Sequence, residues 1–192
     1  MAEVLLFHHA LGLTPGVREL GDRLRAGGHV VHVPDLYDGR VFDDLDEGIG
    51  YAREVGFGTL AARGQAVAED LPSALVYAGM SLGAVPAQLL AQTRRGARGA
   101  LLLHGCLPVS EFSSDWPAGV PVQVHGMEGD PFMTEEGGDL EAARALVSST
   151  DEAELFLYPG EEHLFTDSSL SGYDEAATAL LVERVLTFLE QT

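Results

Sequence analysis

Six short apolar runs, separated by helical patterns, are the feature that most constrains the fold of this chain. Each run is continuous rather than alternating, and the runs lie at residues 4–8, 29–33, 74–79, 99–103, 120–124 and 154–158. Parallel strands that are buried on both faces show this continuous pattern. Strands that alternate with helices are typical of a parallel sheet covered by helices. The sequence therefore predicts the α/β class, with a mostly parallel sheet of about six strands and helices on both faces.

Helical patterns fill the intervals between these runs. Thr14 is the expected N-cap of the first helix, because Pro15 follows it at a position that proline favours, and Gly27-Gly28 ends the pattern. Further helices are expected at residues 57–70, from the third run to about residue 93, at 139–148 and at 174–190. Residues 35–56 and 104–119 are expected as loops, the first with a short helix near residues 47–55. We expect one domain over residues 1–192, since no linker or repeat divides the chain.

Charge excludes several classes of protein. The 192 residues carry eleven basic side chains, all of them arginine, against thirty acidic ones, which gives a net charge of −19. Nucleic acids and anionic membranes need a basic surface, so we expect neither as a partner. The lack of lysine also excludes a phosphate-binding P-loop lysine and a Schiff-base lysine.

Hydropathy and cysteine content bear on the compartment. No run of 18 apolar residues occurs and no basic segment precedes the first apolar run, so neither a membrane span nor a signal peptide is predicted. Cys106 is the single cysteine, which excludes an internal disulfide and fits a reducing compartment. We expect a cytoplasmic protein in which Cys106 is a small buried residue.

A serine flanked by glycines follows the third apolar run. The segment Gly79-Met80-Ser81-Leu82-Gly83 spells G-x-S-x-G between a predicted strand and a predicted helix. In such a nucleophile elbow the serine occupies a strained turn, and the glycines allow the strand and the helix to approach closely. The amide of Leu82 is then placed where an oxyanion would form.

Later runs are followed by an acid and a histidine in an order that suits this serine. Ser81 follows the third run, Asp130 the fifth and His163 the sixth, so all three are expected at the same edge of the sheet. A serine nucleophile needs a base, and the base needs an orienting acid. Glu128 and Asp139 stay open as rival acids.

With these motifs in place, the chain resembles the dienelactone hydrolase family of α/β-hydrolases. The matching segments are Val33-Pro-Asp-Leu-Tyr37, Gly79-Met-Ser-Leu-Gly83, His125-Gly-Met-Glu-Gly-Asp130-Pro131 and Tyr158-Pro-Gly-x-x-His163-x-Phe165. They extend over nearly the whole chain in the order that the family has. The resemblance implies an α/β-hydrolase fold that acts on a small acyl substrate without a metal or another cofactor.

The resemblance also implies roles for individual residues. Ser81, Asp130 and His163 would form the catalytic triad, and the amides of Leu82 and Ala10 would bind the oxyanion. The candidate substrate-binding residues are His9, Met80, Trp116 and Phe165.

The chain departs from the family's namesake enzymes at three positions. Ser81 stands where those enzymes have a cysteine nucleophile, and His9 stands where they have a glutamate in the oxyanion loop. Asp167 stands where they place an arginine, four residues after the catalytic histidine, that holds the carboxylate of the substrate. Because an aspartate repels a carboxylate, we expect neutral acyl substrates rather than carboxylate-bearing lactones.

We expect a serine hydrolase that cleaves an ester, lactone or thioester bond through an acyl-enzyme on Ser81. Two other classes remain open. One is a non-catalytic binding protein that keeps the fold, because a fold does not determine a function. The other is a metal-dependent hydrolase, although the spacing of the candidate ligands matches no H-E-x-x-H motif. Those candidates are the histidines at the strand ends, His8, His9, His104 and His125. His29 and His32 lie within the second run and are expected to be structural.

Overall fold

Six parallel strands form one sheet in the order β2-β1-β3-β4-β5-β6. The structure is a computed structural model that describes residues 1–136 and 138–192, without the side chains of residues 135 and 136. The strands are β1 (Glu3–Phe7), β2 (Val30–His32), β3 (Val76–Met80), β4 (Gly99–Leu103), β5 (Val122–Met127) and β6 (Ala153–Tyr158). The predicted α/β class and parallel sheet are therefore confirmed.

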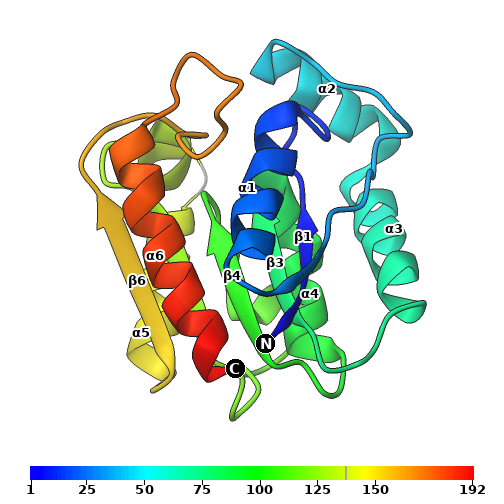
Figure 1. Ribbon diagram of the computed structural model, residues 1–192, viewed down its shortest axis with the longest axis vertical. Coiled ribbons are helices and arrows are strands. Elements are labelled where there is room, and N and C mark those ends of the chain that lie inside the picture. The colour runs from blue at the N-terminus through cyan, green and yellow to red at the C-terminus, as the bar shows by residue number, and fades with distance from the viewer. Residues whose placement is uncertain (137) are drawn as a thin grey trace.

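Helices cover both faces of the sheet, as Figure 1 shows. Their bounds are α1 (Pro15–Ala26), α2 (Leu45–Val55), α3 (Phe57–Glu69), α4 (Ala84–Thr93), α5 (Asp139–Ser149) and α6 (Glu175–Gln191). Side chains of β1 alternate between two cores: Val4 and Leu6 pack with α1 and α6, whereas Leu5 and Phe7 pack with the helices on the other face. Because both faces are covered, every position of a central strand is buried, which explains the continuous apolar runs.

Side-chain caps define the starts of three helices. The Thr14 hydroxyl accepts a hydrogen bond from the Val17 amide and begins α1 as predicted. Asp44 caps α2 and Asp174 caps α6 in the same manner. With its cap at Asp44, α2 begins earlier than the expected short helix. Among the described residues, no helix combines the length and the apolarity needed to cross a bilayer.

The fifth strand differs most from its prediction. It was expected at residues 120–124, but β5 runs from Val122 to Met127 and contains His125. Pro121 has no N–H, and only its carbonyl takes part in the ladder, where it accepts from the Ala100 amide. His125 fits inside the sheet because its ring nitrogens contact the Tyr158 hydroxyl and Gln123 Oε1. His125 is therefore a core residue of the strand rather than a residue beyond its end.

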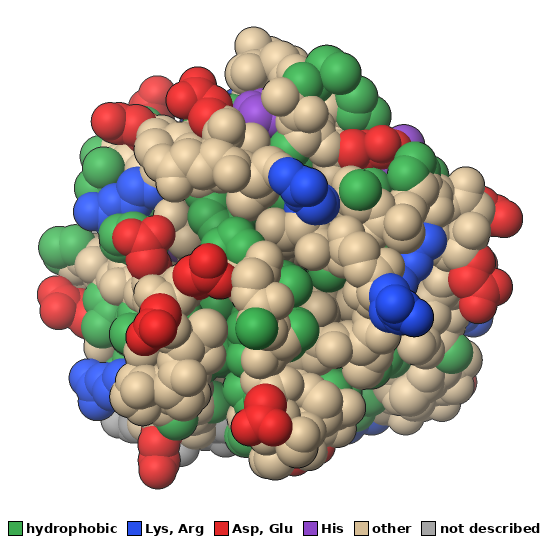
Figure 2. All heavy atoms as spheres, turned by 90° about the horizontal axis from the view of Figure 1, so that it is seen from below, with side chains coloured by type: hydrophobic (Ala, Val, Ile, Leu, Met, Phe, Trp, Pro, Cys, Tyr) green, Lys and Arg blue, Asp and Glu red, His purple; other side chains and the backbone are tan. Residues whose placement is uncertain are grey.

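The net charge of the chain is −19. Figure 2 views the molecule from the amino ends of the strands, where both acidic and arginine side chains are scattered over the face. On this face the acidity forms no single patch.

Two glycines bring the serine turn against the centre of the sheet. A Cβ on Gly79 would lie 2.0 Å from the Gly83 carbonyl oxygen, so the strand and the turn are in backbone contact. A Cβ on Gly83 would lie 2.4 Å from the carbonyl oxygen of Phe7 and 2.7 Å from that of His8. The start of α4 therefore packs on the carboxyl end of β1, and this packing has no room for a side chain at residue 83.

We expect Gly83→Ala to lower the free energy of unfolding by about 1–3 kcal/mol, because the backbone of β1 must move to admit the methyl group. Urea unfolding followed by circular dichroism measures the change. Gly50→Ala is the control: this glycine lies in the middle of α2, with no atom within 4 Å of the added Cβ. It should raise stability by about 0.5–1 kcal/mol. Equal effects of the two substitutions would contradict the close approach.

Candidate active site

Ser81 lies at the carboxyl end of β3, in the turn that leads into α4. Its φ angle is +50°, a left-handed conformation that costs a non-glycine residue free energy. The turn continues as a short 3₁₀ helix over Ser81–Gly83. This is the strained strand-to-helix turn that the G-x-S-x-G segment predicts.

A chain of two hydrogen bonds links Ser81 to His163 and His163 to Asp130. The Ser81 Oγ lies 2.8 Å from His163 Nε2, and His163 Nδ1 lies 2.7 Å from Asp130 Oδ2. Because a carboxylate accepts, we assign the ring proton to Nδ1, which leaves Nε2 free to accept the serine proton. Asp130 is fully buried, and its Oδ1 accepts from the Phe132 amide at 2.9 Å. The three predicted residues therefore meet in the geometry that proton transfer from a serine requires.

Phe132 is a site residue that the sequence reasoning missed. Its ring lies 4.4 Å from the His163 ring, centre to centre, at an interplanar angle of 31°. This contact restricts the imidazole to the plane in which it meets both Ser81 and Asp130. In the sequence, this contact is indicated by nothing more than an aromatic residue two positions after the candidate acid.

The two candidate oxyanion donors lie on neighbouring segments. Leu82 follows the serine, and its turn packs through Gly83 on the carbonyls at the end of β1, just before Ala10. On the other side, a Cβ on Gly48 of α2 would lie 2.3 Å from the Ala10 carbonyl oxygen. The loop that holds Ala10 is thus enclosed between α2 and the serine turn. Within the described residues, the Ala10 amide has no hydrogen-bond acceptor, which leaves it available to a substrate.

The four candidate substrate-binding residues lie in the interior. His9, Met80 and Phe165 have no exposed surface, and Trp116 is 9% exposed. Met80 and Phe165 belong to the core under α1 and α6. Trp116 belongs to the other core and donates from its ring nitrogen to the Val120 carbonyl. The structure places none of them in the cavity beside His163.

That cavity has a volume of about 420 Å³. It is lined by apolar side chains and by two exposed carboxylates. The apolar group is Leu11, Leu45, Leu164 and Leu170. The carboxylates are those of Asp43 and Glu162. His163 lines the cavity directly, and Leu11 directly follows the oxyanion candidate Ala10, whereas Ser81 and Leu82 are not among the lining residues.

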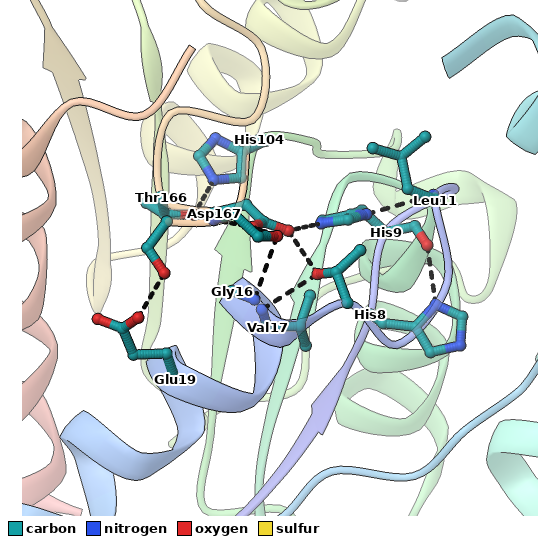
Figure 3. A network of polar contacts seen from close by, with 12 residues as sticks. His8, His9, Leu11, Gly16, Val17, Glu19, His104, Thr166 and Asp167 are labelled. Carbon is teal, nitrogen blue, oxygen red and sulfur yellow. Dashed lines mark hydrogen bonds and ion pairs between the residues drawn. The ribbon is translucent and has the colours of Figure 1, made fainter. Parts of the chain in front are cut away.

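Asp167 does not face this cavity, and the expectation that it repels a substrate carboxylate is wrong. Its side chain is fully buried, and its Oδ2 lies 2.7 Å from His9 Nε2 (Figure 3). The two positions at which the chain departs from the namesake enzymes, apart from the nucleophile, are therefore in contact with each other. A carboxylate whose oxygens are engaged by protein donors cannot approach a substrate.

The other candidate metal-binding histidines are held by separate protein partners. Burial lowers the pKa of His8 to about 4 and that of His125 to about 3, so both are neutral at pH 7. Burial also lowers the pKa of His104 well below its usual value, and its Nε2 contacts the Thr166 hydroxyl. Among the described residues, no group of three or more histidines, cysteines or acids is close enough to hold a metal ion.

The comparison with known families agrees with this geometry. The model of the dienelactone hydrolase family matches residues 1–192. The chain belongs to the dienelactone hydrolase family. It is accordingly a hydrolase with an α/β-hydrolase fold, although no curated protein sequence matches it.

Solved structures of low sequence identity share the fold of this family member. A candidate dienelactone hydrolase from Klebsiella pneumoniae is 19% identical with a TM-score of 0.76, and the match covers 100% of this chain and 88% of that one. A dienelactone hydrolase-like promiscuous phosphotriesterase from metagenomic libraries is 20% identical, with a TM-score of 0.76 and coverages of 100% and 86%. Esterase 2 of Thermogutta terrifontis is 15% identical, with a TM-score of 0.69 and coverages of 99% and 83%.

The geometry distinguishes Asp130 from its rival acids. Asp139 accepts from the Cys106 amide, and Glu128 is exposed. We expect Asp130→Asn to lower kcat by about 10⁴-fold, because the amide stabilises the wrong imidazole tautomer. Glu128→Gln should leave kcat near the wild-type value. Steady-state kinetics on a p-nitrophenyl ester measures both, and the reverse pattern would transfer the role to Glu128.

Proposed function

We propose that this protein is a serine hydrolase that cleaves an ester, lactone or thioester bond through an acyl-enzyme on Ser81. The observation that carries the proposal is the pair of hydrogen bonds from Ser81 to His163 and from His163 to Asp130. The positive φ of Ser81 supports it further. Residues held in such a strained conformation cluster at functional sites, active sites among them.

Acylation begins at the Ser81 hydroxyl. The Oγ atom attacks the substrate carbonyl carbon while His163 Nε2 takes the hydroxyl proton. The carbonyl π electrons move to oxygen, and the amides of Leu82 and Ala10 donate to the resulting oxyanion. One such donor is typically worth about 10²–10³ in kcat. The tetrahedral intermediate then collapses, and the alcohol or thiol leaves with the proton that His163 returns.

Deacylation repeats these steps with water. His163 removes a proton from a water molecule, which attacks the acyl carbon, and Ser81 regains its proton as the acid leaves. Asp130 keeps the imidazole in the required tautomer and stabilises the imidazolium that forms in each half-reaction. The ring of Phe132 lies against the same imidazole and adds a cation–π contact in that state.

A fluorophosphonate probe tests whether Ser81 is the nucleophile. Intact-protein mass spectrometry should show one adduct on the wild type and none on Ser81→Ala. Cys106 is the natural competitor, but it is fully buried, and burial with the nearby Asp139 charge raises its pKa to about 12. Cys106→Ala should therefore keep the adduct. An adduct that survives in Ser81→Ala would remove the basis of the proposed function.

The cavity beside His163 supports a preference for uncharged substrates. Asp43 and Glu162 are its acidic lining residues. A unit charge about 4 Å away in water is worth about 1 kcal/mol, and about 1.4 kcal/mol is tenfold in rate. We therefore expect kcat/KM for a neutral ester to exceed that of a carboxylate-bearing ester of equal size by about fivefold for each nearby acid.

Three variants, each of which removes one negative charge, test this preference for uncharged esters. Asp43→Asn and Glu162→Gln should each narrow the gap between the two esters, and added salt should narrow it in the wild type. Asp151→Asn is the control, because this exposed acid lies just before β6, at the amino end of the strand, whereas His163 follows its carboxyl end. A wild type that hydrolyses the carboxylate ester faster would show that the cavity does not set this preference.

A further inference from the structure

The buried carboxylate of Asp167 lies between the loop that follows His163 and the loop that holds Ala10. Asp167 has no exposed surface, yet each of its oxygens accepts two hydrogen bonds (Figure 3). Oδ1 accepts from the amide and the hydroxyl of Ser169, at 2.9 and 2.5 Å. Oδ2 accepts from His9 Nε2 at 2.7 Å and from the Thr14 hydroxyl at 2.5 Å. All four protein donors thus converge on one side chain.

Hydrogen-bond donors and a helix end balance the carboxylate. His9 Nδ1 accepts from the Leu11 amide, so we assign a proton to Nε2, which donates to Asp167. The first turn of α1 lies against the carboxylate: a Cβ on Gly16 would be 1.7 Å from Oδ1. The N-terminus of a helix favours a negative charge. Burial raises the pKa of Asp167, but the hydrogen bonds from His9, Ser169 and Thr14 outweigh it and lower the pKa to about 2.

Two segments that are distant in sequence meet at Asp167: the stretch from His9 to Thr14 and the loop after His163. His9 directly precedes the oxyanion candidate Ala10 and is 158 residues away from Asp167 along the chain. Thr14 is the N-cap of α1. Asp167 itself lies four residues after His163. The contact between His9 and Asp167 therefore joins the loop of the base directly to the loop of the oxyanion donor.

The segment after His163 is also fixed on its other sides. The Thr166 hydroxyl contacts His104 Nε2 at 2.7 Å, and the Phe165 carbonyl accepts from the Asp174 amide and the Thr178 hydroxyl. These contacts hold the segment to β4 and α6. Asp167 holds it to the loop after β1 through His9 and Thr14, while Ser168 and Ser169 hold it to α1 through Glu19 and Gly16.

We propose that Asp167 is a positioning residue that sets the distance between His163 and the Ala10 amide. The inference rests on the proposed function, since it assigns those two groups to one reaction. Reacting groups must be held within about 0.5 Å of their productive positions. A misplacement of about 1 Å by a change away from the chemistry can cost about 100-fold in rate. Asp167 acts through His9 and its own loop and does not touch the substrate.

The first test is Asp167→Asn, which keeps the size of the side chain but replaces one acceptor oxygen with a donor. Active sites are counted with the fluorophosphonate probe, so that kcat refers to folded enzyme. We expect kcat to fall about 10- to 100-fold with little change in KM for a neutral ester. The Ki of a trifluoromethyl ketone should rise by the same factor. This ketone adds Ser81 Oγ to its carbonyl and becomes an oxyanion, so it reports the alignment of the Ala10 donor.

Leu24→Ala is the matched control for stability. Leu24 is 3% exposed and lies near the other end of α1, so its truncation leaves a cavity far from Asp167. It should lower the melting temperature but leave kcat per labelled site and the ketone Ki unchanged. If Asp167→Asn behaves in the same way as Leu24→Ala, its role is structural only and the inference is overturned.

A pair of His9 substitutions gives an independent answer and decides alone if Asp167→Asn does not fold. In His9→Leu, the leucine can neither donate to Asp167 nor accept from the Leu11 amide, whereas in His9→Gln the glutamine keeps an N–H group that can still donate to Asp167. We expect the glutamine variant to keep a kcat several-fold higher than the leucine variant, with the ketone Ki following the same order. Equal values in the two variants would overturn the inference. A wild type with neither label nor ester turnover would instead overturn the proposed function, and the inference with it.

Discussion

The close approach of Gly83 to the carboxyl end of β1 is the constraint on which the candidate site depends. The carbonyls of Phe7 and His8 lie where a side chain at residue 83 would be, so the start of α4 is held directly against the central strands. Ser81, two residues before this contact, has the left-handed conformation that only a well-determined surrounding structure can maintain. The packing of Gly83 also brings the Leu82 amide beside the loop of Ala10. Gly48 allows a second close approach of the same kind, because its lack of a side chain lets α2 pack directly on the Ala10 carbonyl.

Two buried carboxylates organise the loops around this packed centre. Asp130 and Asp167 are both fully buried in a chain whose net charge is −19. Their nearest basic partners are imidazoles, and their remaining acceptor positions are filled by amides and hydroxyls of nearby loops. A buried charge must be matched by directed donors, so each carboxylate fixes the loop that supplies them. These interior charges therefore define the geometry of the loops around the candidate site.

The sequence predicted the features that depend on where a residue lies along a strand, namely the sheet itself and the residues at the strand ends. Continuous apolar runs are sufficient to indicate a parallel sheet, and the residues just after those runs had to include the site, which is why Ser81, Asp130 and His163 could be picked out. The sequence could not predict how the loops turn after leaving the sheet. His9, Met80, Trp116 and Phe165 were assigned to a substrate pocket, but their side chains turn inward. The contact of Phe132 with His163 and the burial of Asp167 depend on the same unknown loop paths.

The order of the strands has a consequence for how this protein acquires activity. Ser81 lies in the first half of the chain, but His163 follows β6, the last strand to be made and the outermost strand beside β5. In the mechanism that we propose, a chain whose β6 has not paired lacks a positioned base for Ser81. That mechanism therefore requires the final strand to be in place before turnover begins. Catalysis in this architecture serves as an indicator of completed folding, since a partly folded chain can be compact and still inert.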